Sequence, residues 1–195
     1  MGKEKYLKTI EKLFSKSPVV SYSSIERVIN YKKKTKAYVK RFINELLKKG
    51  KIKRLTKGYY TTSDNSALIV FCFKEAYLGL QDALSFHNLW EQETIPIIIT
   101  TKKIRQGIRK VFGNNVLIRR IEKKYLFGIE YYQEDKIAFP YSDIEKTFID
   151  MIYFNEKINK ETLKEFKKRL NKKKFNRYLK KYPKRFRNKI KGILE

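Results

Sequence analysis

Residues 35–60 read TKAYVKRFINELLKKGKIKRLTKGYY, and this stretch decides the fold of the N-terminal region. Its first half predicts a helix, because apolar residues recur there at helical spacing. They are Val39, Phe42, Ile43, Leu46 and Leu47. Thr35 is a suitable N-cap, and Gly50 suits the position that ends a helix. The period then changes, and residues 52–55 and 59–61 predict a hairpin around a Lys-Gly turn.

Two further helices are expected before this stretch, at residues 3–16 and 22–30, from the same periodicity. Ser23 and Glu26 have the spacing of a capping box at the start of the second helix. Three helices followed by a hairpin is the order of a winged helix-turn-helix. The passage from the third helix into the hairpin closely resembles that family. The sequence therefore predicts a winged helix-turn-helix DNA-binding domain at residues 1–62.

Basic and amide side chains lie opposite the apolar stripe of the third helix and on the hairpin. A helix of this kind lies in the major groove, with its N-terminal side chains at base edges. Arg41 and Asn44 are the base-reading candidates, because Arg pairs with guanine and Asn with adenine. Lysines are point charges and suit phosphates. The predicted DNA contacts are Lys33, Lys34, Lys36, Lys40, Arg41, Asn44, Lys53, Arg54 and Lys57.

The alternative for this basic surface is a solvated face without a ligand, which is the usual role of a charge run. Against it stands the basic run at the start of the third helix, where positive charge opposes the helix dipole. A recognition helix would gain from charge at that place. Winged helices that bind RNA or protein are the remaining alternative.

The net charge of +27 is divided unevenly along the chain. Residues 1–66 carry 18 Lys and Arg against 5 Asp and Glu, and residues 155–195 carry 17 against 4. The residues between them are nearly neutral, with 12 basic and 11 acidic side chains. Such basic clusters are typical of proteins that neutralise phosphates and release counterions.

A second domain of mixed α+β class is expected at residues 67–195, after a polar linker at 63–66. Residues 67–73 are apolar without alternation, so they form either a buried strand or a buried helical turn. Residues 75–91 predict a helix. Strands are predicted at residues 95–101, 116–121, 125–132 and 137–139, with turn signals between them. We expect a sheet of about four strands within residues 67–140 and a basic helical tail at about 142–195.

The tail places aromatic residues among its cations, at Phe166, Phe175, Tyr178, Tyr182 and Phe186. Aromatics at helical spacing are more often core than a stacking platform for bases, and we favour helices packed on the sheet. Their basic outer face is predicted to comprise Lys167, Lys168, Lys172, Lys173, Arg177, Lys180 and Lys181. It extends the DNA contact or meets an acidic partner, and the sequence leaves both open.

Residues 77–89 (YLGLQDALSFHNL) resemble the "sAL-x-x-HGL" helix of AbiEi-type antitoxins, which belong to type IV toxin–antitoxin (abortive infection) systems. Residues 142–153 (SDIEKTFIDMIY) are similar to that family's "E-K-[AT]-h-h-D-h-h-Y" helix. Asn88 stands where the family commonly has Gly. The order of domains also matches, so the resemblance covers nearly the whole chain. It implies an autorepressor that binds double-stranded DNA at operator repeats in its own promoter. It also implies neutralisation of a nucleotidyltransferase toxin.

No catalytic residue, metal site or cofactor is expected. His87 is the only histidine and Cys72 the only cysteine, and no Gly-rich phosphate loop occurs. The carboxylates Asp143, Glu145 and Asp150 have a structural interpretation. Ser142 is predicted to cap a helix with Glu145 at the capping-box position, and Asp150 to pair with a basic residue of the tail.

No apolar stretch is long enough to span a membrane, and a single cysteine favours a reducing compartment, so a cytoplasmic protein is expected. The leading hypothesis is a non-enzymatic DNA-binding autorepressor and antitoxin. The alternative is a stand-alone winged-helix transcription factor, or an RNA-binding accessory protein, without a toxin. A nucleic-acid enzyme that uses the acidic residues is a further alternative.

Overall fold

The structure is a computed structural model that describes residues 2–30 and 35–194. The chain divides into two compact units, and the main division lies between Cys72 and Phe73, with Val111–Asn114 assigned to the first unit. This division lies a few residues beyond the linker expected at 63–66. Both units combine helices with strands, so the predicted α+β class is confirmed.

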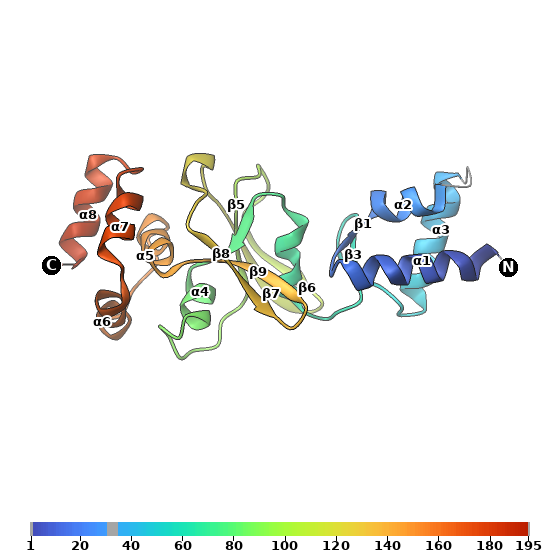
Figure 1. The fold of residues 1–195 in the computed structure, drawn as a ribbon, viewed down its shortest axis with the longest axis horizontal. Helices are drawn as coiled ribbons and strands as arrows, with labels where there is room; N and C mark the ends of the chain where they lie inside the picture. The colour runs from blue at the N-terminus through green and yellow to red at the C-terminus, as the bar shows by residue number, and fades with distance from the viewer. Residues whose placement is uncertain (1, 31–34, 195) are drawn as a thin grey trace. The chain divides into compact units, whose positions relative to one another are not determined.

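The first unit begins with helices and ends with a hairpin (Figure 1). Its elements are α1 (Gly2–Lys16), β1 (Val20–Ser21), α2 (Tyr22–Asn30), α3 (Lys36–Lys48), β2 (Lys53–Thr56), β3 (Tyr59–Thr61) and the 3-10 helix η1 (Ser66–Cys72). Among its described residues a small antiparallel sheet has the order β1-β3-β2. The helix-to-hairpin order predicted for the winged helix-turn-helix is therefore confirmed, and η1 shows that residues 67–73 form mainly a helical turn.

The ends of α3 follow the local signals in its sequence. Thr35 is the N-cap, and its side chain accepts a hydrogen bond from the backbone N–H of Tyr38. Gly50 has a φ of 65°, and the N–H of Lys51 donates to the carbonyl of Leu46 at 3.0 Å. This is the Schellman arrangement that glycine favours because it lacks a Cβ. Both predicted ends of the helix are confirmed.

The start of α2 differs from the predicted capping box. Ser21, not Ser23, accepts the backbone N–H of Ser24, at 3.1 Å from its Oγ. The helix starts at Tyr22, as expected, directly after β1 at Val20–Ser21, so Ser21 and not Ser23 occupies the cap. The capping box predicted for Ser23 with Glu26 was wrong.

The second unit contains a mixed sheet and the C-terminal helices (Figure 1). Its strands and first helices are β4 (Ala76–Leu78), α4 (Gln81–Phe86), β5 (Ile97–Thr100), β6 (Gly107–Val111), β7 (Asn114–Arg120), η2 (Lys123–Tyr125), β8 (Ile129–Glu134) and β9 (Ile137–Ser142). The last helices are α5 (Ile144–Tyr153), α6 (Lys160–Arg169), α7 (Lys172–Leu179) and α8 (Lys184–Leu194).

In the described part of this unit, six strands form the sheet in the order β6-β7-β5-β4-β9-β8. The pairs β4–β9 and β5–β7 are parallel, whereas β4–β5 and β8–β9 are antiparallel. The strands predicted within 95–101, 116–121, 125–132 and 137–139 correspond to β5, β7, β8 and β9. The sequence did not predict β4 or β6, so the sheet is wider than expected.

The helix predicted at residues 75–91 is mostly wrong, because only α4 is helical within it. Residues 76–78 form β4 instead, between β5 and β9. Leu80 then takes a φ of 57°, which ends the strand and turns the chain into α4. Gly79 is required at this turn, since a Cβ there would lie 2.6 Å from Cδ1 of Ile99.

The C-terminal helices complete the core of the second unit. The aromatic rings of Phe166, Phe175 and Tyr182 are 0%, 5% and 3% exposed and pack in the same cluster as β4, β5 and α5 residues. Phe148 of α5 lies edge-on to Phe166, with ring centroids 4.8 Å apart. The tail aromatics are core residues, as the favoured interpretation predicted.

Candidate nucleic-acid interface

One face of α3 packs into the first unit and the opposite face is exposed. Val39, Phe42, Ile43 and Leu46 are buried against α1, α2 and the small sheet. The predicted contacts Lys36, Lys40, Arg41 and Asn44 are all exposed. Lys33 and Lys34 lie outside the described residues. The helical spacing therefore separates the apolar and the basic residues of this segment as expected.

The hairpin β2–β3 carries the other predicted contacts. Arg54 and Lys57 are exposed, while Leu55 between them is buried. Gly58 has a φ of 79°, which closes the tight turn that glycine favours. Lys53 differs from its neighbours, because its ammonium forms an ion pair with Asp64 of the following segment. Its charge is already partly compensated within the protein.

The exposed face of α3 and the hairpin enclose a hollow of about 540 Å³. The hollow brings together Lys40, Asn44, Arg54 and Lys57 from the predicted set. Lys36 and Arg41 do not line it, although both are exposed on the same helix. Positive charge and an amide thus converge on a concave surface between the helix and the hairpin.

Tyr22 also lines this hollow and was not predicted as a functional residue. Its backbone N–H donates to the carbonyl of Gly58 at 2.7 Å, which fixes the start of α2 to the hairpin turn. Its buried hydroxyl has no hydrogen-bond partner among the described residues. Burial, with smaller contributions from Glu26 and Tyr60, raises the pKa of this phenol, so it remains a donor at neutral pH. No local sequence pattern identifies Tyr22 as a lining residue, because it joins the hollow only when the hairpin folds against the start of α2.

The basic residues predicted in the tail lie on the exposed sides of α6 and α7 and just after them. Lys167, Lys168, Lys172, Lys173, Arg177, Lys180 and Lys181 are all exposed. Lys168 pairs with Glu165 at 2.7 Å, and the ammonium of Lys181 lies 4.0 Å from the ring centroid of Phe127. The remaining cations are available to an anionic partner, whether nucleic acid or protein.

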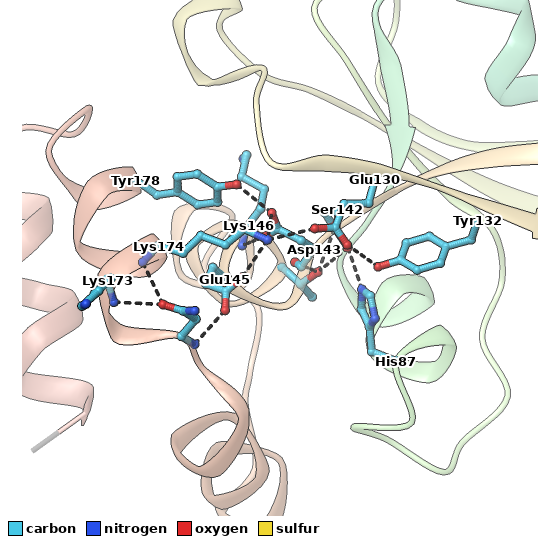
Figure 2. A network of polar contacts seen from close by, with 12 residues as sticks. His87, Glu130, Tyr132, Ser142, Asp143, Glu145, Lys146, Lys173, Lys174 and Tyr178 are labelled. Carbon is cyan, nitrogen blue, oxygen red and sulfur yellow. Dashed lines mark hydrogen bonds and ion pairs between the residues drawn. The ribbon is translucent and has the colours of Figure 1, made fainter.

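A polar network in the second unit contains two of the carboxylates considered as candidates in the sequence, Asp143 and Glu145 (Figure 2). Lys174 of α7 pairs with Glu130, Asp143 and Glu145 at 2.9, 3.0 and 3.3 Å. Although burial opposes it, hydrogen bonds from Lys174 to Glu130 and Asp143 raise the pKa of this lysine. The carboxylates are therefore used to hold α7 against β8 and the start of α5.

The N-cap of α5 is Asp143 rather than the predicted Ser142. Asp143 Oδ1 accepts the backbone N–H of Lys146 at 2.7 Å, and its Oδ2 accepts the hydroxyl of Tyr178 at 2.8 Å. Glu145 does not complete a capping box and instead accepts the N–H of Asn171 at 2.8 Å. The capping bond of Asp143 is local, whereas its second oxygen and Glu145 both contact the segment that contains α7 and its N-cap.

Asp150 pairs with Lys146 of its own helix and not with a tail residue, so that prediction was wrong. Both side chains are 0% exposed, and Tyr77 donates its hydroxyl to Asp150 at 2.6 Å. The signal for this pair was present in the sequence, since residues four apart on a helix are neighbours.

His87 is buried, with its Nε2 located 2.7 Å from the carbonyl oxygen of Ser142 (Figure 2). Burial lowers the pKa of this imidazole, so the neutral ring with a proton on Nε2 fits the contact. Arg169 donates to the carbonyl of His87 at 2.6 Å, which ties α6 to the end of α4. His87 therefore has a packing role, because it connects the end of α4 to Ser142 and to α6.

Comparison with protein-family models and with curated proteins returns no match for this chain. Within residues 2–30 and 35–194, every helix is too short or too polar to traverse a lipid bilayer. The same residues contain no group of three or more His, Cys, Asp and Glu side chains arranged to hold a metal ion.

Proposed function

We propose that this protein is a DNA-binding transcriptional regulator whose first unit reads an operator. The observation that carries the proposal is the hollow between α3 and the hairpin, in which Lys40, Asn44, Arg54 and Lys57 converge. A convergent cationic surface with an amide matches the donors that nucleic acids require. Phosphate oxygens accept from lysine, arginine and tyrosine, and base edges accept from arginine and asparagine.

In the proposed complex, α3 lies in the major groove and the hairpin lies along the flanking backbone. Arg41 and Asn44 read bases, because their planar groups make bidentate hydrogen bonds. Lys36, Lys40 and Lys57 contact phosphates, where a point charge is sufficient.

The test uses the full chain and fluorescence anisotropy on fluorescein-labelled duplexes selected from its own promoter region. Arg41→Ala should cost about 1–3 kcal/mol against one base position and relax specificity there. Lys40→Ala should weaken all duplexes alike and reduce the slope of log K against log salt by about one. Lys12→Ala, on the exposed side of α1, is the matched control, because it removes a charge outside the hollow.

Equal affinity for all duplexes, unaffected by Arg41→Ala or Lys40→Ala, would refute the assignment of α3 as the recognition helix. A loss for Lys12→Ala as large as that for Lys40→Ala would point to unspecific attraction by the net charge. An RNA hairpin bound more tightly than any duplex would favour the RNA-binding alternative.

We further propose that the regulator is an autorepressor and an antitoxin against a nucleotidyltransferase toxin. This part rests on the resemblance of residues 77–89 and 142–153 to the AbiEi family. The residues of the second motif are mostly buried, including Glu145, Lys146 and Asp150, so they support the fold of the second unit and not a direct contact. The toxin contact is therefore sought on exposed residues.

The antitoxin proposal is tested by co-expression with the neighbouring gene product of the native host. Rescue from toxicity supports it, and a neighbour that is not nucleotidyltransferase-like, with no rescue, leaves a stand-alone transcription factor. Changing Lys167, Lys172, Lys173 and Lys180 together to Gln separates the two roles of the tail. Retained DNA binding with lost rescue would assign that charge to the toxin, and the reverse would assign it to DNA.

A further inference from the structure

The second unit contains a hollow of about 570 Å³ bordered by α4, the segment before β5, and the strands β8 and β9. Its size is in the range of small-molecule sites. It shares Tyr132 with the polar network of Figure 2, but Lys174 and its carboxylate partners do not line it, and it is separate from the hollow beside α3. Its lining combines carboxylates with aromatic rings, which is unusual in so basic a chain.

Three carboxylates line this hollow, from Asp82, Glu93 and Glu134. None of them forms an ion pair with any residue that the structure describes, although the chain has 47 Lys and Arg against 20 Asp and Glu. Asp82 is held in place by the backbone N–H of Ile97, which donates to its Oδ2 at 3.1 Å. Burial raises the pKa of Asp82 to about 7, so this carboxyl is partly protonated at neutral pH, whereas the charges of Glu93 and Glu134 are uncompensated within the described protein.

Aromatic rings form another part of the lining. Phe86 and Tyr141 stack with centroids 4.1 Å apart and an angle of 13° between their planes. Tyr132 is tilted against Phe86 at 4.7 Å. Phe86 is 38% exposed, which is high for a large apolar side chain, so part of its surface is available to a ligand.

The hydroxyl of Tyr141 is a further polar group of this hollow that the protein leaves open to a ligand. The side chain is only 9% exposed and lines the hollow, yet its hydroxyl has no hydrogen-bond partner among the described residues. Burial, and then the nearby charges of Asp82 and Glu134, raise the pKa of this phenol. The hydroxyl therefore lies close to two of the three carboxylates and remains protonated.

We propose that this hollow binds the ammonium or guanidinium group of a small organic amine. The faces of aromatic rings attract cations, and Asp82, Glu93 and Glu134 accept the N–H groups that such a cation carries. The lone pairs of the Tyr141 hydroxyl accept a further N–H group. Phosphates and other anions are repelled by the same carboxylates, so this activity is separate from nucleic-acid binding by the basic surfaces.

The experiment is isothermal titration calorimetry of the full chain with agmatine, which carries both a guanidinium and an ammonium group. Saturable binding is expected at physiological salt, and Glu134→Gln should weaken it about tenfold, since it removes one charged acceptor. Phe86→Ala should weaken it about fivefold through loss of the ring face. Asp135→Asn is the matched control, because Asp135 is the exposed neighbour of Glu134 and does not line the hollow.

Tyr141→Phe, which keeps the ring stack, should weaken binding about threefold by removing the hydroxyl. Absence of saturable binding would overturn the proposal. A loss for Asp135→Asn equal to that for Glu134→Gln would overturn it too, because it would indicate diffuse charge attraction. N-acetylarginine amide is titrated in parallel. Binding of this compound without binding of agmatine would overturn the proposal of a small amine and would indicate that the ligand is an arginine side chain of a partner protein.

Discussion

Replacing Asp150 by leucine is expected to lower the free energy of unfolding of the second unit by about 3–5 kcal/mol. The substitution removes the carboxylate that pairs with Lys146 and accepts the hydroxyl of Tyr77 at 2.6 Å. Both members of the ion pair are fully buried, so water does not replace the lost partner. A buried ammonium without a counter-ion is the source of the cost.

The magnitude follows from what remains around Lys146. Its ammonium lies 5.5 Å from the ring centroid of Tyr77 and 5.2 Å from that of Phe127. Such cation–π contacts contribute about 2 kcal/mol or somewhat more when desolvated, which is less than the cost of about 3–5 kcal/mol for the unpaired charge. The exposed pair Lys168–Glu165 is the matched comparison, and Lys168→Met should cost less than about 1 kcal/mol.

A triple variant distinguishes the unpaired charge from a simple loss of packing. Tyr77→Phe, Lys146→Met and Asp150→Leu together remove every polar member of the cluster and keep its volume approximately constant. Replacement of a buried ion pair by apolar residues of similar size is often neutral or stabilising. The triple variant should therefore be about 3 kcal/mol more stable than Asp150→Leu alone.

The assay is urea unfolding followed by the fluorescence of Trp90. This is the only tryptophan of the chain, and it packs against the core of the second unit, so the signal reports on that unit. Burial lowers the pKa of Lys146, and loss of Asp150 lowers it further. The unfolded chain then binds more protons than the folded one above neutral pH, so the stability of Asp150→Leu should rise between pH 7 and about pH 10.

The rise with pH should be steeper for Asp150→Leu than for the unsubstituted protein, in which Asp150 still favours the charged lysine. A loss below about 1 kcal/mol, or a triple variant no more stable than the single one, would refute the reasoning. A flat pH profile for Asp150→Leu would show that the ammonium is not desolvated.

Two further substitutions test local backbone features of the fold. Because Ser21 caps α2, Ser21→Ala should lower the stability by about 1 kcal/mol in thermal unfolding followed by circular dichroism. Ser23→Ala is the control and should change the stability little. A larger loss for Ser23→Ala than for Ser21→Ala would refute the assignment of the cap. Gly128 has a φ of 67°, and a Cβ there would lie 2.8 Å from the Cβ of Lys146, so Gly128→Ala should cost about 2 kcal/mol or more in urea unfolding. Gly192→Ala, in an open helical position, should instead stabilise by about 0.5–1 kcal/mol, and equal effects of both would contradict the clash.

The first unit was predictable because its signals are local. Helical spacing marks the buried face of α3, Thr35 and Gly50 mark its ends, and the Lys-Gly turn marks the hairpin. Each of these features depends on residues within a few positions of one another. The strand β1 was missed because its two residues become a strand only by pairing with β3.

The interior of the second unit was less predictable, since its sheet is covered on more than one side. β4 lies between β5 and β9, and Tyr77 and Leu78 are both buried. A strand buried on both faces loses the alternation that identifies a strand from sequence. The apolar spacing of residues 76–84 therefore indicated a helix. The turn at Gly79 and Leu80 becomes apparent only in the structure, where the backbone of Gly79 lies close to the side chain of Ile99.

The candidate sites show the same division between local and distant information. Among the predicted cations, Lys36, Lys40, Arg41, Arg54 and Lys57 are exposed, because amphipathic patterns separate them from the core. The pairing of Lys53 with Asp64, the hydroxyl of Tyr22 and the hollow beside Phe86 all depend on segments brought together by the fold. Sequence patterns therefore identified the charges and not the concave surfaces that would use them.

The basic tail is the place where this distinction changes an experiment. Its charge suggests a detachable arm, and deleting residues 155–195 would be the natural test of such an arm. The same residues supply Phe166, Phe175, Tyr182 and Ile190 to the core, and Lys174 anchors α7 to carboxylates of β8 and α5. Deletion would expose that core and unfold the second unit, so loss of any activity would carry no information on the charge. Only substitution of the exposed lysines, with the aromatic side of each helix kept intact, tests whether the tail binds DNA or a protein.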